Sequence, residues 1–144
     1  MSTKLISSLK WLLWFVCAFH LIVGIGLNVS AGFPQAVAEY YGATVDWTPE
    51  FQYIVKPIGA FMIAIGIMAG AAARNPLANS SVVHGLVALF VMRGLQRIVF
   101  REEIANALAI AGGRNIANAI FFLLMAAVLF FLFRAARQRA ARIV

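Results

Sequence analysis

The sequence is poor in charged residues. Asp, Glu, Lys and Arg make up only 12% of its 144 residues, whereas 63% are hydrophobic, and the mean hydropathy is +0.90. A soluble domain carries about a quarter of its residues as charges, so the composition places this chain among membrane proteins. The length allows about four spans of roughly 20 residues with short connections, which makes one domain.

Cysteine and histidine are also scarce. Cys17 is the one cysteine and lies inside an apolar run, so no intrachain disulfide can form. The two histidines and this thiol show no ligand spacing typical of zinc sites. We therefore predict no metal site.

Catalytic patterns are absent as well. The sequence contains no P-loop, no dinucleotide fingerprint and no pairing of a nucleophile with a base. No Asp or Glu falls within a long apolar run, which disfavours an ion-coupled transporter because proton relays through membranes use such acids. We predict that the protein is not an enzyme.

Acidic residues are outnumbered by basic ones. The chain has 12 Lys and Arg against 5 Asp and Glu, and its net charge is +7. Nucleic-acid-binding proteins share such a balance, but here the positive charge gathers near the chain ends, beside apolar runs. Membrane topology and anionic lipids account for that placement. We therefore predict membrane lipids as partners and no nucleic acid.

Long hydrophobic runs are what the sequence does have. Four uncharged stretches cover residues 11–38, 57–73, 75–92 and 115–133. Each has 17 residues or more, near the roughly 20 that cross about 30 Å of hydrocarbon. The predicted fold class is therefore all-α, an integral membrane four-helix bundle that forms a single transmembrane domain over residues 1–144.

Local signals set the predicted helix bounds. Thr48 is suited to cap a helix with Pro49 at its first position, and Pro57 predicts a kink within that helix. Ser80 or Ser81 is the predicted cap of the next helix. The predicted helices cover about 9–28, 49–73, 81–101 and 114–138, and an outer loop covers about 29–48.

The first helix has a competing interpretation. Lys4 and Lys10 precede its apolar run, and "VSA" at 29–31 resembles a signal-peptide cleavage site. Because the apolar run is long for a signal peptide, we predict a retained helix. In the loop that follows, "FPQAVAEYYG" predicts two helical turns on the membrane surface, closed by Gly42.

The distribution of charge predicts the orientation. With four spans, both termini share one side of the membrane. That side carries seven Lys and Arg, at positions 4, 10, 74, 134, 137, 139 and 142. The opposite loops carry three, at positions 56, 101 and 114, together with all five acids. The positive-inside rule therefore predicts that both termini are cytoplasmic, N-in and C-in.

Two arginines lie deep in the third predicted span, within "ALFVMRGLQRIVF". Counted from Val82, Arg93 lies roughly 17 Å and Arg97 roughly 22 Å along the helix. Gln96 shares their face through three- and four-residue spacings. An arginine at the bilayer centre costs roughly 2.5–3.5 kcal/mol on insertion scales, so this polar stripe is predicted to face the bundle interior or a wet cavity.

Residues of two other spans are predicted to join this stripe. Lys56 and the carbonyl of Tyr53, which Pro57 leaves without its helical donor, come from the second span. Asn115 and Asn118 come from the start of the fourth. Together these residues predict a cationic recess that opens outward.

The recess has two interpretations, and the sequence leaves both open. In the structural one, Arg97 and Arg101 extend outward to the interface. An acid then neutralises the cluster and holds the outer loop, the candidates being Glu39, Asp46, Glu50 and Glu102. In the functional one, the recess binds an anionic or carbonyl-bearing amphiphile, such as a lipid or a quinone, with its tail between helices. Intramembrane charge favours a functional site, but the nearby acids make simple ion pairing easy.

The two histidines allow a further alternative. His20 lies in the middle of the first span and His84 one turn into the third, at depths about 10 Å apart, too far to share one haem iron. His20 alone could serve as an axial ligand of a haem or a chlorophyll-type pigment. A hydrogen bond to a neighbouring helix is the competing role.

Small residues form a stripe on the second span. In "GAFMIAIGIMAGAAA", this stripe contains Gly59, Gly66, Gly70 and Ala73. Small residues at such spacing let helix backbones approach closely, so we predict a helix-packing face. The sequence leaves open whether this face packs inside the bundle or against another protein.

The segment "KPIGAFMIAIGIMAGAAARNP", followed by "GLVALFVMRGLQRIVF", resembles helices two and three of small four-span bacterial membrane proteins of the broad DoxX-like group. The matching positions are Gly59, Gly66, Arg74, Pro76 and Arg97. The resemblance covers about a third of the chain. It implies a four-helix bundle in a bacterial inner membrane, with a place beside quinone-linked or other electron-transfer enzymes.

Together these patterns predict a small non-catalytic accessory subunit of a larger membrane complex, with other membrane protein subunits as partners. One alternative is a protein that binds a quinone or a lipid in the recess. Another is a pigment- or haem-binding protein that uses His20. The candidate cofactors are accordingly a quinone or a lipid, with a tetrapyrrole as the further alternative.

Overall fold

The computed structural model describes residues 2–141, and this part of the chain is all-α, as predicted. Four helices are long and apolar enough to cross a membrane. They are α1 (Ser2–Val29), α3 (Pro49–Arg74), α4 (Ser80–Val99) and α6 (Gly112–Ala140). Two short helices, α2 (Phe33–Tyr41) and α5 (Arg101–Leu108), lie in the connections.

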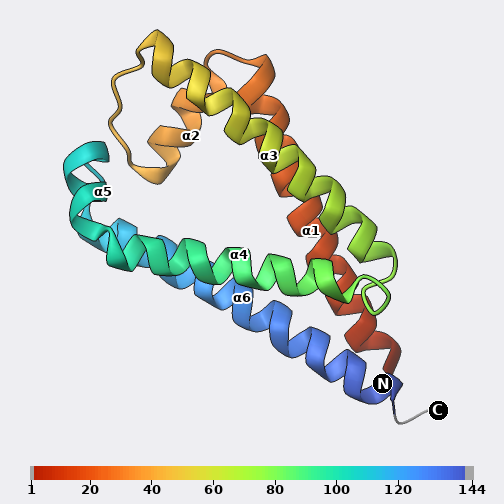
Figure 1. Cartoon of the computed structure of the whole chain (residues 1–144). Helices are drawn as coiled ribbons and strands as arrows, with labels where there is room; N and C mark the ends of the chain where they lie inside the picture. Colours follow the sequence, from red (N-terminus) through yellow and green to blue (C-terminus); the bar gives the residue numbers. More distant parts are fainter. Residues whose placement is uncertain (1, 142–144) are drawn as a thin grey trace.

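The long helices form two antiparallel hairpins, α1 with α3 and α4 with α6 (Figure 1). The hairpins meet where α1 starts and α6 ends, and they diverge toward α2 and α5 (Figure 1). We call these two ends of the molecule the terminal end and the loop end. The bundle is therefore V-shaped, and α2 lies inside the V near its wide end (Figure 1).

Two helix bounds differ from those predicted. The first helix starts at Ser2 rather than near residue 9, and its added turns carry Ile6, which packs against the core. The third long helix ends at Val99, and the chain then forms α5 instead of a plain loop. Glu102 and Glu103 lie in the first turn of α5, where carboxylates suit the helix dipole.

The caps of the helices follow local chemistry. The Thr48 hydroxyl accepts a hydrogen bond of 3.3 Å from the Phe51 amide, which confirms the predicted cap of α3. The predicted helical turns of the outer loop are confirmed as α2, which ends at Gly42 with a left-handed φ of 73°. The predicted serine caps are wrong: α4 begins at Ser80, so its capping position is Asn79, whose side chain donates to the Asn75 carbonyl instead.

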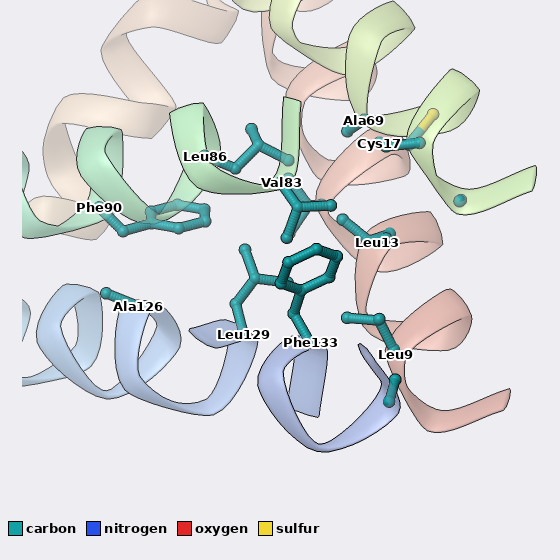
Figure 2. Packing of buried hydrophobic residues seen from close by; sticks show 14 of the residues in the cluster. Leu9, Leu13, Cys17, Ala69, Val83, Leu86, Phe90, Ala126, Leu129 and Phe133 are labelled. Carbon is teal, nitrogen blue, oxygen red and sulfur yellow. The ribbon is translucent and has the colours of Figure 1, made fainter. Parts of the chain in front are cut away.

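The core fills the terminal end. Leu9 and Leu13 of α1 meet Val83 of α4 and Leu129 and Phe133 of α6, and all five are buried (Figure 2). Small side chains of α3, such as Ala69, complete the cluster. Side chains that interlock in this way hold the hairpins together by dispersion contacts, since lipid tails supply no hydrophobic driving force between helices.

Glycines bring α1 and α3 into backbone contact. A methyl group placed at Gly24 would lie 2.7 Å from the Gly59 carbonyl oxygen and 2.8 Å from the Ile63 nitrogen. Nearer the terminal end, Gly66 faces Leu21 of α1 and Gly70 faces Cys17. The small-residue stripe of α3, with its buried Ala73, thus lies inside the bundle.

The two loop regions are linked at the loop end. The Thr44 amide, which follows α2, donates a 2.8 Å hydrogen bond to the carbonyl of Leu108, the last residue of α5. The Arg114 side chain of α6 lies against the backbone of Gly42, at the end of α2. These contacts connect the tips of the two hairpins where their long helices have separated.

Candidate functional site

The predicted polar stripe lines a hollow at the loop end of α4. Arg93, Gln96 and Arg97 face Ile104 and Leu108 of α5 across a volume of about 200 Å³. We call this hollow the arginine recess. Its three polar residues share one helical face, as their spacing requires, and α5 supplies the opposite wall.

Asn115 fixes the position of Arg97. One guanidinium nitrogen of Arg97 donates to the Asn115 side-chain oxygen at 2.9 Å, and the Asn115 side-chain nitrogen donates to the Arg97 carbonyl at 2.7 Å. Asn115 is buried at the start of α6, so this reciprocal pair also joins α4 to α6. The prediction that these two residues lie together agrees with this geometry.

Both guanidinium groups also make cation–π contacts with aromatic rings. Arg93 lies over the Phe122 ring, with 4.5 Å between the guanidinium carbon and the ring centroid. Arg97 lies 5.9 Å from the same ring and 5.4 Å from the ring of Tyr41 at the end of α2. Cations are attracted to ring faces within about 6 Å, and the attraction is larger when both partners are desolvated.

No carboxylate neutralises this cluster within residues 2–141. The ion pair formed there joins Arg101 and Glu102 at 3.6 Å, and both side chains are exposed. Glu39, Asp46 and Glu50 are likewise exposed and lie beyond 4.0 Å from any Arg or Lys nitrogen in this range. Of the structural interpretation, the fold therefore contains the Arg101–Glu102 pair, but no acid in this range pairs with Arg93 or Arg97.

An apolar groove adjoins the arginine recess. It encloses about 390 Å³ between the diverging hairpins, and Arg93 is its one charged lining residue. Its walls come from α1, α2, α3 and α4, and include Phe19, Leu27, Phe33, Tyr41, Met62 and Arg93. We call it the apolar groove. Because Arg93 lines both spaces, its guanidinium stands at their junction.

Two residues predicted for the recess lie elsewhere. Tyr53 is 70% exposed on α3, and Lys56 lines a separate hollow of about 260 Å³ with Asn28 and Gln52. Because the hairpins diverge toward the loop end, this part of α3 stands away from α4 (Figure 1). Pro57 lies inside α3, which continues through it.

Asn118 lies one turn beyond the Asn115 position on α6. Its side-chain nitrogen is buried and has no hydrogen-bond partner among residues 2–141. The spacing of four residues places it on one face with Arg114 and Phe122. It therefore belongs to the same wall as the ring under Arg93, although it touches neither hydrogen bond of the Arg97 pair.

His20 lies beside the arginine site rather than apart from it. Its side chain is only 1% exposed, and its Nδ1 lies 2.8 Å from the Val16 carbonyl oxygen one turn back. A hollow of about 40 Å³, lined by His20 and Arg93 together with aromatic side chains, adjoins it. A tetrapyrrole ring would need these aromatic side chains to move apart. His84 lies at the terminal end against Phe133.

Sequence reasoning missed the contributions of Tyr41 and Phe122. Both are aromatic residues in segments rich in aromatic side chains, so nothing in the sequence distinguishes them from lipid-facing or core residues. A weak signal exists for Phe122, which lies seven residues after Asn115 and so on the same helical face. No comparable signal places the end of α2 over α4.

Within residues 2–141, no group of three or more His, Cys, Asp or Glu side chains is arranged to hold a metal ion. Comparisons with family models, with curated proteins and with solved structures find no match to this chain. The resemblance to the DoxX-like group therefore stays a prediction. The site must be interpreted from its own geometry.

Proposed function

We propose that the protein binds one amphiphile at Arg93, with the oxygen-bearing head in the arginine recess and the apolar tail in the adjoining groove. The observation that supports this is a pair of guanidinium groups with no carboxylate within 4.0 Å among residues 2–141, at the edge of an apolar groove. The head is an anion or a carbonyl, since guanidinium is a donor with no acceptor atom.

Energetics favours a bound ligand over an empty recess. A desolvated cation in a membrane is costly unless acceptors surround it, and Arg97 has one side-chain acceptor, Asn115, whereas Arg93 has a ring face. An oxygen acceptor from a ligand would complete the hydrogen bonding of both groups. The groove volume of about 390 Å³ falls within the range of small-molecule sites, which are mostly apolar with a few placed polar groups.

The orientation belongs to the same proposal. With both termini in the cytoplasm, the arginine recess lies in the outer half of the bilayer, and α2 and α5 lie at the outer interface. The support is the excess of Lys and Arg on the terminal side, seven against three, counted on the sequence. We place the protein in a bacterial inner membrane. Ligand binding needs no catalysis and is compatible with an accessory place in a larger complex.

The binding test uses single-chain probes that differ in head group. Purified protein in mild detergent is titrated with hexadecanoate, with a decyl-substituted benzoquinone and with hexadecyltrimethylammonium, and bound ligand is counted by native mass spectrometry. We expect the carboxylate or the quinone to bind at one site and the cationic amphiphile not to bind. Which of the first two binds distinguishes a lipid-type anion from a quinone carbonyl.

Arg93→Leu tests the role of the guanidinium. We expect it to weaken probe binding at least tenfold, since a hydrogen bond to a charged group contributes roughly 1.5–3 kcal/mol. Arg101→Leu is the matched control, because Arg101 is exposed on α5 and pairs with Glu102. The proposal would be contradicted if the natural chain, Arg93→Leu and Arg101→Leu all bound the probes with equal affinity. It would also be contradicted if the cationic amphiphile bound as tightly as the carboxylate or the quinone.

A further inference from the structure

His20 is a buried polar residue with one free ring nitrogen. Its Nε2 is buried and has no hydrogen-bond partner among residues 2–141. The great majority of buried polar atoms have a hydrogen-bond partner, so a buried atom without one needs an explanation. The cost of leaving such an acceptor unpaired is as large as that of losing a hydrogen bond.

The hydrogen bond at the other ring nitrogen fixes what Nε2 can do. Nδ1 lies 2.8 Å from the Val16 carbonyl oxygen, and a carbonyl can only accept, so Nδ1 carries the proton. In the neutral ring, Nε2 is then an acceptor. Phe19 lies edge-on to the imidazole at 5.5 Å and Phe90 lies tilted at 6.2 Å, and these rings keep it in place. The missing partner must therefore be a donor.

His20 also lines a small hollow that leads to the ligand site. We call the hollow of about 40 Å³ that His20 lines the histidine hollow. Phe19 and Arg93 line both this hollow and the apolar groove, so the two spaces adjoin at these side chains. The rest of its lining is apolar, and the volume admits a hydroxyl-sized group, since one water needs about 10–15 Å³ on the same measure.

We infer that His20 is a specificity-determining residue that accepts a hydrogen bond from a hydroxyl of the bound amphiphile. The inference rests on the proposed function, because the same ligand must place an acceptor oxygen at Arg93. The recognised pattern is a hydroxyl and an acceptor oxygen on one head group that carries an apolar chain. In a 2-hydroxy acyl chain the two lie on adjacent carbons, and in a 1,4-benzoquinol they lie on opposite carbons of the ring.

Two matched probe pairs test this pattern. The first is 2-hydroxyhexadecanoate against hexadecanoate, and the second is a decyl-substituted benzoquinol, kept reduced, against its benzoquinone. We expect the hydroxyl-bearing member of one pair to bind about tenfold more tightly, because it satisfies a buried acceptor that its partner leaves unpaired. The pair that shows the preference identifies the source of the hydroxyl. Equal affinities within both pairs would overturn the inference.

Variants of His20 connect the preference to its ring nitrogen. His20→Phe keeps an aromatic ring against Phe19 and Phe90 but removes the acceptor nitrogen. The two probes of a pair should then bind with about equal affinity, and the probe without the hydroxyl should bind as it does to the natural chain. His20→Gln retains an acceptor oxygen and should restore part of the preference. It also serves as the test if the phenylalanine variant does not fold. An unchanged preference in both variants would overturn the inference.

His84→Phe is the matched control, because His84 lies on α4 at the terminal end, edge-on to Phe133. It should leave every affinity unchanged. The two proposals fail in different ways. If the ligand site itself is absent, no probe binds in a manner that depends on Arg93. If only the inference about His20 fails, both members of a pair bind with Arg93 dependence and equal affinity.

Discussion

The two hairpins have the same order of elements but different contacts between their helices. Each consists of a long helix, a short helix and a second long helix, α1–α2–α3 and α4–α5–α6. In the first, Gly24 and Gly59 bring the two backbones together. In the second, the Arg97–Asn115 pair and the parallel rings of Phe90 and Phe122, 6.4 Å apart, lie between α4 and α6.

This difference separates two tasks within one fold. Backbone contact at Gly24 and Gly59 holds α1 and α3 together, and side chains of both helices line the apolar groove. Polar and aromatic side chains of α6 instead hold the guanidinium groups of α4 in place beside the arginine recess. The first hairpin shapes the groove, and the second supplies its charge.

The largest expected effect comes from adding a methyl group to the first hairpin. In Gly24→Ala, the new carbon would lie 2.7–2.8 Å from backbone atoms of α3, which cannot rotate away. We expect the free energy of unfolding to fall by about 3 kcal/mol, the upper part of the range for overpacking. Thermal unfolding in detergent, followed by labelling of the buried Cys17 thiol, measures this change.

Gly85→Ala is the control for that variant. A methyl group at Gly85, in α4, would meet nothing within 4 Å, so this variant should be as stable as the natural chain or more so. Equal destabilisation by the two variants would show that the close approach of α1 to α3 does not limit stability. The difference in helix contacts between the two hairpins would then have no effect on stability.

A smaller effect is expected where the hairpins meet. Leu129 is 0% exposed in the core at the terminal end, and Leu129→Ala removes its contacts with both hairpins (Figure 2). Core Leu→Ala changes cost about 2–5 kcal/mol in water, and we expect the lower limit, about 2 kcal/mol, because lipid replaces water as the solvent. Leu124→Ala, on the same helix but 59% exposed, should change the unfolding midpoint little. A large effect of Leu124→Ala would contradict this placement of the core.

The smallest of the three effects concerns the second hairpin. Asn115→Ala removes both hydrogen bonds to Arg97. Side-chain hydrogen bonds within membranes average about 0.6 kcal/mol, so the two together should contribute about 1 kcal/mol to stability. Thermal unfolding of this variant beside Asn106→Ala, a change at an exposed position of α5, measures the difference. Indistinguishable midpoints would show that Asn115 does not hold the arginine.

The sequence predicts the long helices well because their signals are local and strong. Apolar runs identify all four, and Thr48 with Pro49 identifies the start of α3. The polar stripe of α4 is predicted for the same reason, since the spacing of Arg93, Gln96 and Arg97 on one helix fixes their common face. These features need no knowledge of how the helices pack.

The parts that depend on tertiary packing could not be predicted. Lys56 has the depth along α3 that would suit the recess, but the hairpins diverge there and it lines another hollow. The helix α5 has only eight residues, and Ile104 and Leu108 are its only large apolar side chains, so its apolar pattern is too short to identify a helix. Likewise, the place of Tyr41 over Arg97 depends on how α2 docks, which no residue near Tyr41 specifies.

The hydrogen bond from the Thr44 amide to the Leu108 carbonyl joins the two hairpins through main-chain atoms alone. A main-chain hydrogen bond of this kind does not depend on the side chains at positions 44 and 108. The exception is proline at position 44, because proline has no amide proton. Unlike the side-chain contacts near it, from Arg114 to Gly42 and from Arg97 to Tyr41, this link between the hairpins can therefore persist when surface residues change.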